Sequence, residues 1–279
     1  MTKSVKRTWQ QRKETLKFLL WGVTVVLVCF LLYRVAVNQP TTHLTPLTEG
    51  YRDSLMTIAM PVGMNDTLVK YGDAFAVHFN SGRGVANCTV HELTVGELNG
   101  KAERAGEFMQ DTQVRGCPAP GDYSGSGMDR GHLVPVADLK WSESAMRQSF
   151  FLTNISPMHK ALNEGGWAKL EEKVREWTAR DSALLVFTGP IVSEADSTLS
   201  GGKITVPHAY YKIIMAPCVT PRRVIAFIYP NGHCGGRLRE YAVSVNEIER
   251  QTGLDFFPTL SHDEQERLEG TVNLDAWTN

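Results

Sequence analysis

The feature that most limits how this chain folds is an uncharged apolar segment near the N-terminus, FLLWGVTVVLVCFLLY, which occupies residues 18–33. After Arg34 the apolar character resumes for three residues, up to Val37. Because the arginine side chain can extend to the membrane surface, residues 18–37 reach the length of about 20 residues that a spanning helix needs. The segment therefore predicts a transmembrane helix followed by a separate globular part.

The charges around this segment predict its orientation. Basic residues cluster before it, whereas after Arg34 the next Lys or Arg is Arg52. The positive-inside rule places residues 1–17 in the cytoplasm and the C-terminal bulk across the membrane, which in a bacterium means the periplasm. A cleaved signal peptide is the competing interpretation, but no convincing small-x-small cleavage site follows the apolar run. The sequence favours an uncleaved anchor.

The formal charge of -1 hides an asymmetry along the chain. Residues 1–37 contain seven Lys and Arg against one acid, Glu14. Subtracting these from the totals of 29 basic and 30 acidic residues leaves 22 and 29, so the remainder carries about -7. A protein that coats nucleic acid through bulk charge has the opposite balance. Contact with a polyanion must therefore be local, through a basic cleft or a bound metal ion.

The polar, proline-containing residues 38–50 predict a linker, and residues 51–279 predict a single domain. Of the five cysteines, Cys29 lies in the apolar segment. An even set remains in a domain expected outside the cytoplasm, where disulfides persist; it consists of Cys88, Cys117, Cys218 and Cys234. Four cysteines allow three connectivities, and the sequence does not choose among them. No C-x-x-C pair occurs, which argues against a structural zinc site.

Apolar and alternating runs within the domain predict a mixed, largely antiparallel central sheet. Residues 74–80 and 87–95 alternate as strands do and flank a turn, which predicts a hairpin. Three apolar, β-branched or aromatic runs predict buried strands at residues 183–192, 210–216 and 223–230. One segment, 163–180, has helical spacing of its apolar residues, which are Trp167, Leu170, Val174 and Trp177. The expected fold class is α+β, with helices packed on the sheet.

The segment from Gly125 to Glu172 carries most of the chemical information. Five of its side chains have groups suited to catalysis or metal binding, namely Arg130, His132, Asn154, Asn163 and Glu171. Taken singly, each has an ordinary structural explanation. The histidine is then a hydrogen-bonded core or surface residue, the first asparagine a turn residue and the second a helix N-cap. The glutamate is a solvated helix position, and the arginine forms an ion pair with its acidic neighbour.

Together these residues resemble the DNA/RNA non-specific endonuclease family, which includes secreted bacterial nucleases and mitochondrial endonuclease G. The resemblance is carried by Asp129-Arg130-Gly131-His132, by FLTNISP at 151–157, by LNEGGW at 162–167 and by Leu170-Glu171. Weaker similarity continues in Val206-Pro207, in Tyr211-Lys212, in residues 245–249 and in residues 252–254, so it covers most of the chain after about residue 70. One departure is Met158-His159, where the family commonly has glutamine after the proline; it bears on local packing or substrate contact.

The resemblance implies a ββα-metal finger set in a mixed sheet, and a divalent ion, Mg²⁺, with Mn²⁺ or another divalent ion as alternatives. It assigns the general base to His132, whose neutral imidazole can take a proton from water near neutral pH. Mg²⁺ often keeps several waters, so one direct ligand, the amide oxygen of Asn163, is sufficient. Glu171 lies eight residues further along the expected helix, on a neighbouring face, and is expected to hold a water of the metal.

The remaining residues of the segment complete the expected site. Arg130 suits the scissile phosphate because its guanidinium donates two parallel hydrogen bonds. Asn154 is expected to orient the base or the attacking water, and Asp129 to brace the loop. Such a site contacts the sugar-phosphate backbone, which carries no base sequence, and hydrolysis by an external water needs no 2′-hydroxyl. Both DNA and RNA are therefore predicted substrates.

Two other interpretations are possible. The run YSGSGMD at 123–129 suggests a serine hydrolase, but G-x-S-x-G fails, since Ser124 has Asp122 two residues before it and Ser126 has Ser124. A catalytically inactive nucleic-acid-binding or envelope interaction protein with the same fold is the alternative from another class. Competent residues at every proposed position and the acidic balance of the domain argue against it.

Overall fold

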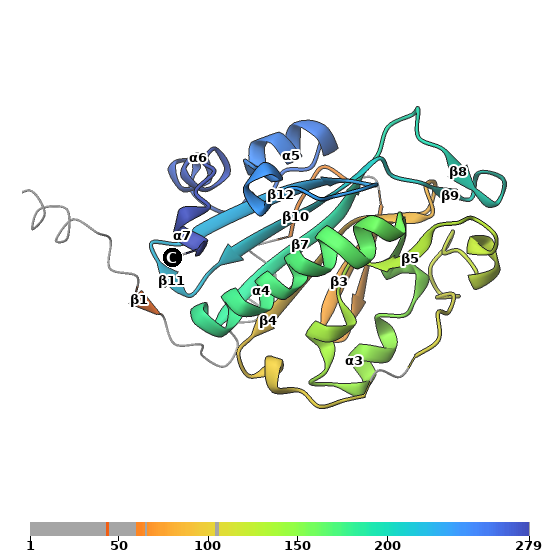
Figure 1. Ribbon diagram of the computed structural model, residues 1–279, viewed down its shortest axis with the longest axis horizontal. Helices are drawn as coiled ribbons and strands as arrows, with labels where there is room; N and C mark the ends of the chain where they lie inside the picture. Colours follow the sequence, from red (N-terminus) through yellow and green to blue (C-terminus); the bar gives the residue numbers. More distant parts are fainter. Residues whose placement is uncertain (1–42, 45–59, 65, 104–105, 279) are drawn as a thin grey trace, which may run out of the picture. The chain divides into compact units, whose positions relative to one another are not determined.

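The centre of the structure, a computed structural model that describes residues 43–44, 60–64, 66–103 and 106–278, is a seven-stranded sheet. Its order is β13-β12-β10-β7-β4-β3-β2, and every neighbouring pair is antiparallel (Figure 1). The strands are β2 (Thr67–Tyr71), β3 (Phe75–Asn80), β4 (Val85–Thr94), β7 (Ala183–Ile191), β10 (Ala209–Ala216), β12 (Arg223–Pro230) and β13 (Ala242–Val243). The mixed fold with a largely antiparallel sheet is confirmed, and all five predicted strands are present.

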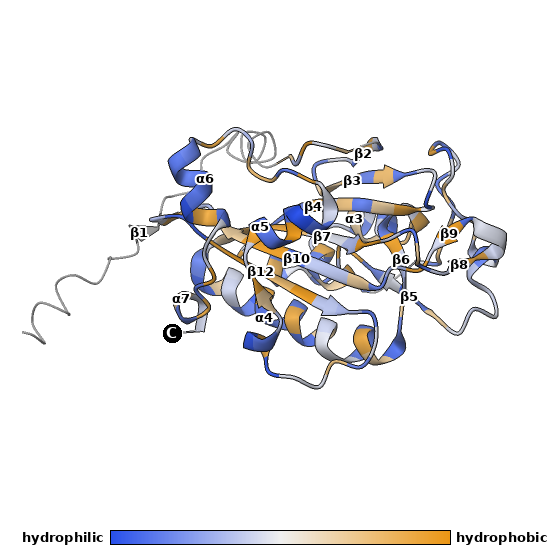
Figure 2. Ribbon diagram, turned by 90° about the horizontal axis from the view of Figure 1, so that it is seen from above, coloured by the Kyte–Doolittle hydropathy of each residue, from blue (hydrophilic) through white to orange (hydrophobic). Residues whose placement is uncertain are grey.

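Alternation along the strands divides the core into two layers. In β7, Leu184 and Val186 face one layer, and Leu185 and Phe187 face the other. Helix α4 (Ala168–Asp181) covers the first face of the sheet. Helices α5 (Val245–Thr252) and α6 (His262–Glu269) cover the second. Figure 2 shows α4 and α5 on opposite sides of the sheet. Both faces of the central strands are buried, which explains why β7 and β10 are mostly apolar.

Shorter elements connect the layers. Three two-stranded pairs lie outside the main sheet: β1 (His43–Leu44) with β11 (Val219–Thr220), β5 (Asp129–His132) with β6 (Ile155–Met158), and β8 (Thr198–Leu199) with β9 (Ile204–Thr205). The remaining helices are η1 (Glu97–Asn99), η2 (Pro120–Tyr123), η3 (Val136–Leu139), α3 (Glu143–Gln148), η4 (Leu152–Asn154), η5 (Leu162–Trp167), η6 (Ser200–Gly202), η7 (Leu238–Glu240) and α7 (Asp275–Thr278).

The helix predicted over residues 163–180 is present but is not continuous. Its first turns form η5, which contains a kink, and the regular helix α4 begins at Ala168. Gly165, inside η5, has φ -108° and ψ -107°, which are not helical. The apolar face of α4 lies where the spacing predicted it, because Leu170, Val174 and Trp177 are buried against the sheet.

The expected disulfides are not found, and that expectation was wrong. All four cysteines of the domain are free thiols. Cys88 faces the α5 side of the sheet, whereas Cys117 packs in the α4 layer. Lys212 on β10 pairs with Thr188, which pairs with Thr89, the neighbour of Cys88. Cys218 lies six residues beyond Lys212, so roughly 20 Å of strand separates Cys218 from Cys88. A disulfide requires Cα atoms within about 7 Å.

Within the described residues, no helix is long and apolar enough to cross a membrane. The anchor predicted at residues 18–37 lies outside those residues and stays a prediction. The predicted linker, residues 38–50, is described only at His43–Leu44, which pairs with β11. Residues 43–279 form one compact unit.

Candidate active site

Strands β5 and β6 and the helix that follows them form a ββα unit beside the main sheet. The two strands pair antiparallel, with Asp129 opposite Met158 and His132 opposite Ile155. An added Cβ atom on Gly131 would collide with the Met158 side chain, which is fully buried, so glycine is required between the arginine and the histidine. The departure from the family pattern at Met158 therefore concerns packing.

His132 and Arg130 lie two residues apart on β5 and share an aromatic neighbour. The His132 ring meets Phe150 edge-on with centroids 4.9 Å apart, and its centroid lies 5.5 Å from that of Phe108. The Arg130 guanidinium lies 5.2 Å from the centre of the same Phe108 ring. Its Nη2 donates a hydrogen bond of 3.0 Å to the Pro120 carbonyl. The candidate base and the candidate phosphate ligand are thus fixed on one side of β5.

Asn163 is bound through its amide nitrogen rather than placed as a helix cap. Its Nδ2 donates to the Asp129 carboxylate at 3.0 Å. Its backbone N–H already donates to the His159 carbonyl, and the cap position of η5 is Ala161, which makes no side-chain capping bond. An N-cap explanation therefore fails. Because the carboxylate can only accept a hydrogen bond, it fixes which end of the amide is nitrogen, and the Oδ1 atom points away from Asp129.

Asn154 is fully buried, and its side chain bonds to the backbone. Its Nδ2 donates to the carbonyls of Val134 and Ser149, and its Oδ1 accepts from the Val134 N–H. These bonds hold the chain two residues after His132. Both amide protons are used, so the side chain is placed to position the segment carrying the base, not to contact a water in the site.

Glu171 lies on α4, partly buried, on the side that faces the sheet. Burial raises the pKa of its carboxyl to about 7, the nearby Lys212 ammonium opposes that shift, and Asp138 adds to it. The pKa of Lys212 is lowered by burial to about 8, and Glu171 opposes that shift. Strand β5 links the Asp129–Asn163 pair with Arg130 and His132, over about 10 Å of strand.

Sequence reasoning missed two contributors to this site. Phe108, which contacts both His132 and Arg130, lies in an irregular segment before the recognised motifs, and no periodicity marked it. Lys212 was marked only by weak similarity, although a lysine inside the apolar run AYYKIIMA was itself a signal, because such a strand buries both faces.

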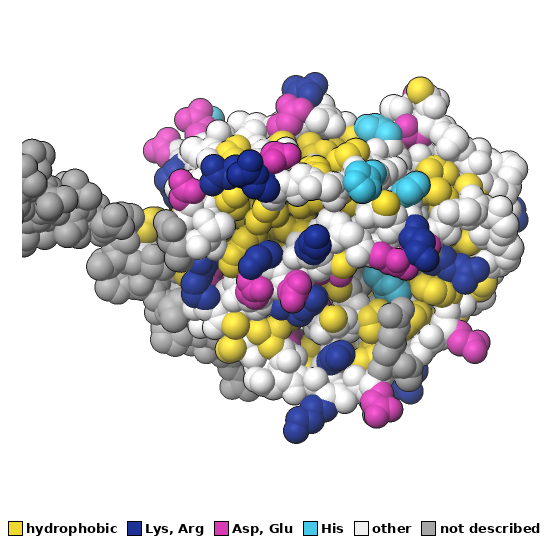
Figure 3. All heavy atoms as spheres, viewed as in Figure 1, with side chains coloured by type: hydrophobic (Ala, Val, Ile, Leu, Met, Phe, Trp, Pro, Cys, Tyr) yellow, Lys and Arg dark blue, Asp and Glu magenta, His cyan; other side chains and the backbone are white. Residues whose placement is uncertain are grey.

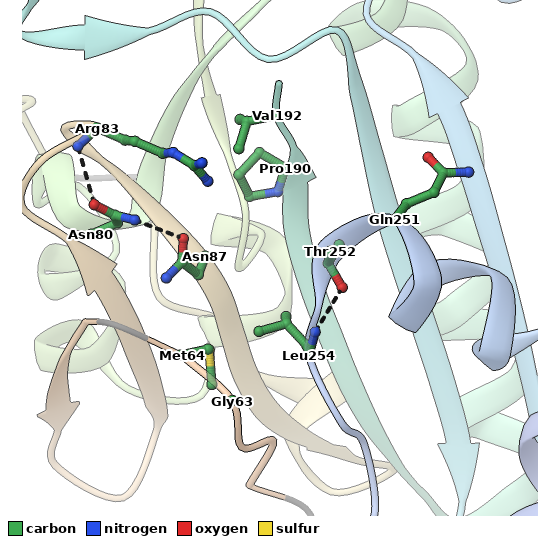
Figure 4. A pocket seen from close by; sticks show the side chains of 10 residues that line it. All are labelled: Gly63, Met64, Asn80, Arg83, Asn87, Pro190, Val192, Gln251, Thr252 and Leu254. Carbon is green, nitrogen blue, oxygen red and sulfur yellow. Dashed lines mark hydrogen bonds between the residues drawn. The ribbon is translucent and has the colours of Figure 1, made fainter. Parts of the chain in front are cut away.

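The pocket in Figure 4 lies elsewhere and contains none of the predicted site residues. Its volume is about 390 Å³, and it is lined by Gly63, Met64, Asn80, Arg83, Asn87, Pro190, Val192, Gln251, Thr252 and Leu254. Most of these residues lie at or next to the ends of β3, β4, β7 and α5, and the pocket is on the α5 side of the sheet. The catalytic motifs lie in the α4 layer.

Charge on the α4 face is mixed. Figure 3 shows basic and acidic side chains interspersed over this face without a broad field of one sign. Among the residues that the structure describes, no three His, Cys, Asp or Glu side chains gather as metal ligands. A divalent ion in this region would therefore depend on the Asn163 oxygen, with water and phosphate oxygens completing its shell.

Comparison with known proteins decides the family. Residues 53–263 match the profile of the DNA/RNA non-specific endonucleases. A nuclease from Nostoc sp. is 32% identical over 224 residues, a match that covers 75% of this chain and 80% of that protein. The chain belongs to the DNA/RNA non-specific endonuclease family. It is accordingly a hydrolytic enzyme that cleaves nucleic acid.

Two further relatives bear on how far this membership extends. Mitochondrial nuclease EXOG of Danio rerio is 39% identical over 154 residues, but the match covers 50% of this chain and 45% of EXOG, so the chain spans less than half of that relative. The solved structure of EndoG in complex with EndoGI superimposes with a TM-score of 0.69 at 21% identity, covering 79% of this chain and 96% of the other. That likeness shows a shared fold.

Proposed function

We propose that this member of the family hydrolyses phosphodiester bonds of DNA and RNA, without base specificity, with the help of a divalent metal ion, Mg²⁺. One observation carries the proposal. The Asp129 carboxylate holds the Asn163 amide by its nitrogen at 3.0 Å, which leaves a neutral oxygen ligand beside the strand that carries Arg130 and His132. This hydrolysis requires three components: a hard cation, a general base and a side chain that binds the scissile phosphate.

In this mechanism His132 is the general base. Its neutral imidazole takes a proton from the attacking water, and the ring is held for that task by Phe150 and Phe108. The amide of Asn154 fixes the chain that follows the histidine. Arg130 uses one N–H of Nη2 to bind the Pro120 carbonyl, and the remaining N–H groups of its two terminal nitrogens would bind oxygens of the scissile phosphate.

The residues that would hold the metal fit a hard divalent cation. Asn163 supplies an uncharged oxygen, and the carboxylate of Asp129 orients it from behind. When bound, the cation offsets negative charge on the phosphate and on the departing oxygen. Glu171 accepts hydrogen bonds from water in the site when its carboxyl is ionised. Mn²⁺ is the alternative ion, because it also takes oxygen ligands.

The charge distribution supports a lack of base specificity. The domain outside residues 1–37 is acidic, and Figure 3 shows no basic field on the α4 face, so binding relies on local phosphate contacts. Contacts to the sugar-phosphate backbone carry no sequence information. Water as the nucleophile makes the 2′-hydroxyl unnecessary, so DNA and RNA both serve.

Nicking of supercoiled plasmid and cleavage of a single-stranded RNA, each with Mg²⁺ and with chelator, test the proposal. We expect cleavage of both substrates only with metal. His132→Ala should fold and bind but lose about 10²–10⁴-fold in turnover. His262→Ala, at an exposed histidine of α6, is the matched control and should keep the wild-type rate. A chelator-resistant wild type refutes metal dependence, an active His132→Ala refutes the base, and an inactive wild type that binds nucleic acid supports an inactive binding protein.

We also propose that residues 18–37 anchor the protein, with the nuclease domain on the side opposite the cytoplasm. The proposal rests on the length and apolarity of this segment and on the basic residues that precede it.

A further inference from the structure

Lys212 is a buried cation that the proposed reaction does not use. It lies on β10 facing α4, with 1% of its surface exposed. Its Nζ donates to the Thr188 hydroxyl of β7 at 2.7 Å and lies 4.7 Å from the centre of the Trp167 ring. Burying an ammonium group is costly unless an opposite charge lies near it. A hydroxyl and an aromatic ring do not offset a full charge, so a carboxylate has to do so.

Four other charged or titratable groups surround this position. Glu171 and Arg175 come from α4, Asp138 from η3 and His91 from β4. Both oxygens of Asp138 are already used: Oδ1 accepts from Arg175 Nη1 at 3.0 Å, and Oδ2 lies 3.2 Å from His91 Nε2. Within the described part of the chain, no hydrogen bond or ion pair occupies the Glu171 carboxylate. Glu171 is therefore the charge that balances Lys212.

The interaction between the two acts at a distance. Lys212 lowers the pKa of Glu171 and Glu171 raises the pKa of Lys212, yet the two side chains form no direct ion pair. The geometry explains this, because Thr188 and Trp167 hold the ammonium group against the sheet. A direct ion pair would occupy carboxylate oxygens that a water in the site needs. A protonated carboxyl would donate a hydrogen bond where the site needs an acceptor.

We propose that Lys212 is a positioning residue, which keeps Glu171 ionised while Thr188 and Trp167 hold its ammonium group away from the carboxylate oxygens. The inference rests on the proposed function for the role of Glu171, but the charge relation itself exists in the metal-free protein.

Lys212→Met tests the charge, because methionine is unbranched and of similar length. The readout is the titration of the Glu171 carboxyl by ¹³C NMR of the full chain with chelator present, assigned with Glu171→Gln. Loss of an opposite charge should raise that titration midpoint by about one pH unit or more. In the metal-loaded enzyme the midpoint of the acid limb of the pH–rate profile should move to higher pH by the same amount. Activity would then fall about tenfold on that limb and recover at higher pH.

Thr188→Val tests the restraint, because it removes the acceptor and keeps a similar volume. The ammonium group is then free to reach Glu171. The Glu171 titration should move down, and the rate should fall at every pH without recovery in alkali. Opposite shifts in the two variants distinguish this arrangement from structural damage, which would not move one carboxyl in opposite directions.

Ile213→Val is the matched control, since Ile213 is buried on the other face of β10. It should leave both the Glu171 titration and the rate profile unchanged. Lys212→Met added to Glu171→Gln should cause no further loss of rate.

An unmoved Glu171 titration in Lys212→Met overturns the inference, as does an equal loss of rate in the Glu171→Gln background. If Lys212→Met fails to fold, Thr188→Val decides, and an unmoved titration there also overturns it. A wild type without nuclease activity would refute the proposed function, whereas the metal-free titration would still test the charge relation.

Discussion

The bond between Asp129 and Asn163 gives the sharpest prediction about the metal. Asp129→Ala removes the only feature that distinguishes the two ends of the Asn163 amide, whose Nδ2 lies 3.0 Å from the Asp129 carboxylate in the described structure. A hydrogen bond to a charged group contributes about 1.5–3 kcal/mol, so the amide now strongly favours one orientation. Without the carboxylate, both orientations become comparable in energy, and the carboxylate no longer increases the basicity of the oxygen.

The expected magnitude follows from these two losses. Random orientation alone halves the population that can bind metal, and loss of a supporting partner typically weakens a site by about 10–100-fold. The Mg²⁺ concentration for half-maximal rate should therefore rise by about 10–100-fold. Asn163 is only partly buried, so water replaces the bond and the free energy of unfolding should fall by about 1 kcal/mol. Asp129→Asn keeps an acceptor without its charge and should lie between Asp129→Ala and wild type.

The measurement is the rate of cleavage as a function of Mg²⁺ concentration, together with thermal melts in the presence of chelator. A lowered melting temperature with an unchanged metal curve would show that Asp129 only braces the loop, and Asn163 would lose its assignment. Asn163→Asp is a complementary variant. It would place two carboxylates about 3 Å apart, which share a proton in the metal-free protein. Metal binding must then displace that proton, so the affinity of the Asn163→Asp variant for Mg²⁺ should increase with pH.

Three other predictions follow from the described residues and from the N-terminal segment. Asn154→Ala leaves two buried carbonyls and one N–H without a partner. Each such group costs about 1–3 kcal/mol, so denaturant titrations should show a free energy of unfolding lower by several kcal/mol. Unchanged stability would contradict the positioning role. The pKa of Glu269 is raised from 4.5 to about 7 by burial and by Glu249 and Asp255, so the folded protein holds a proton that the unfolded chain releases, and stability falls as pH rises from about 4.5 to 7. Glu269→Gln should therefore raise the melting temperature by about 2–4 °C above pH 7 and leave it unchanged below pH 4; a gain at both would refute the cause. Protease added to spheroplasts should digest residues 51–279 while cytoplasmic markers survive, and a resistant domain would reverse the predicted orientation.

The sequence predicts those parts of the fold that depend on local pattern. The strands of the main sheet follow from runs such as residues 223–230, which the structure reproduces as β12. The face of α4 follows from the spacing of Leu170, Val174 and Trp177. Cysteine pairing failed because an even count says nothing about which side of a sheet each thiol faces. Cys88 and Cys117 lie in different layers, and only the strand register determines that.

The sequence names a set of candidate site residues, but not the contacts among them. The motifs name His132, Arg130 and Asn163, but the bond from Asn163 to Asp129 joins positions 34 residues apart. Asn154 and Val134 are 20 residues apart. Such bonds depend on the antiparallel register of β5 and β6, which the resemblance implied but no spacing along the chain reveals.

The break at the start of α4 changes the relation between Asn163 and Glu171 that regular helical spacing predicts. On a regular α-helix, eight residues turn Asn163 and Glu171 to neighbouring faces, so both were expected to serve one metal side by side. A kink at Gly165, whose dihedral angles are not helical, lies between the two residues and changes that register. Asn163 is thereby turned to Asp129 on β5, whereas Glu171 keeps the register of α4 and faces the sheet and Lys212. In this chain the kink separates the two side chains: Asn163 takes its orientation from Asp129 of the ββα unit, and Glu171 takes its charge state from the buried core.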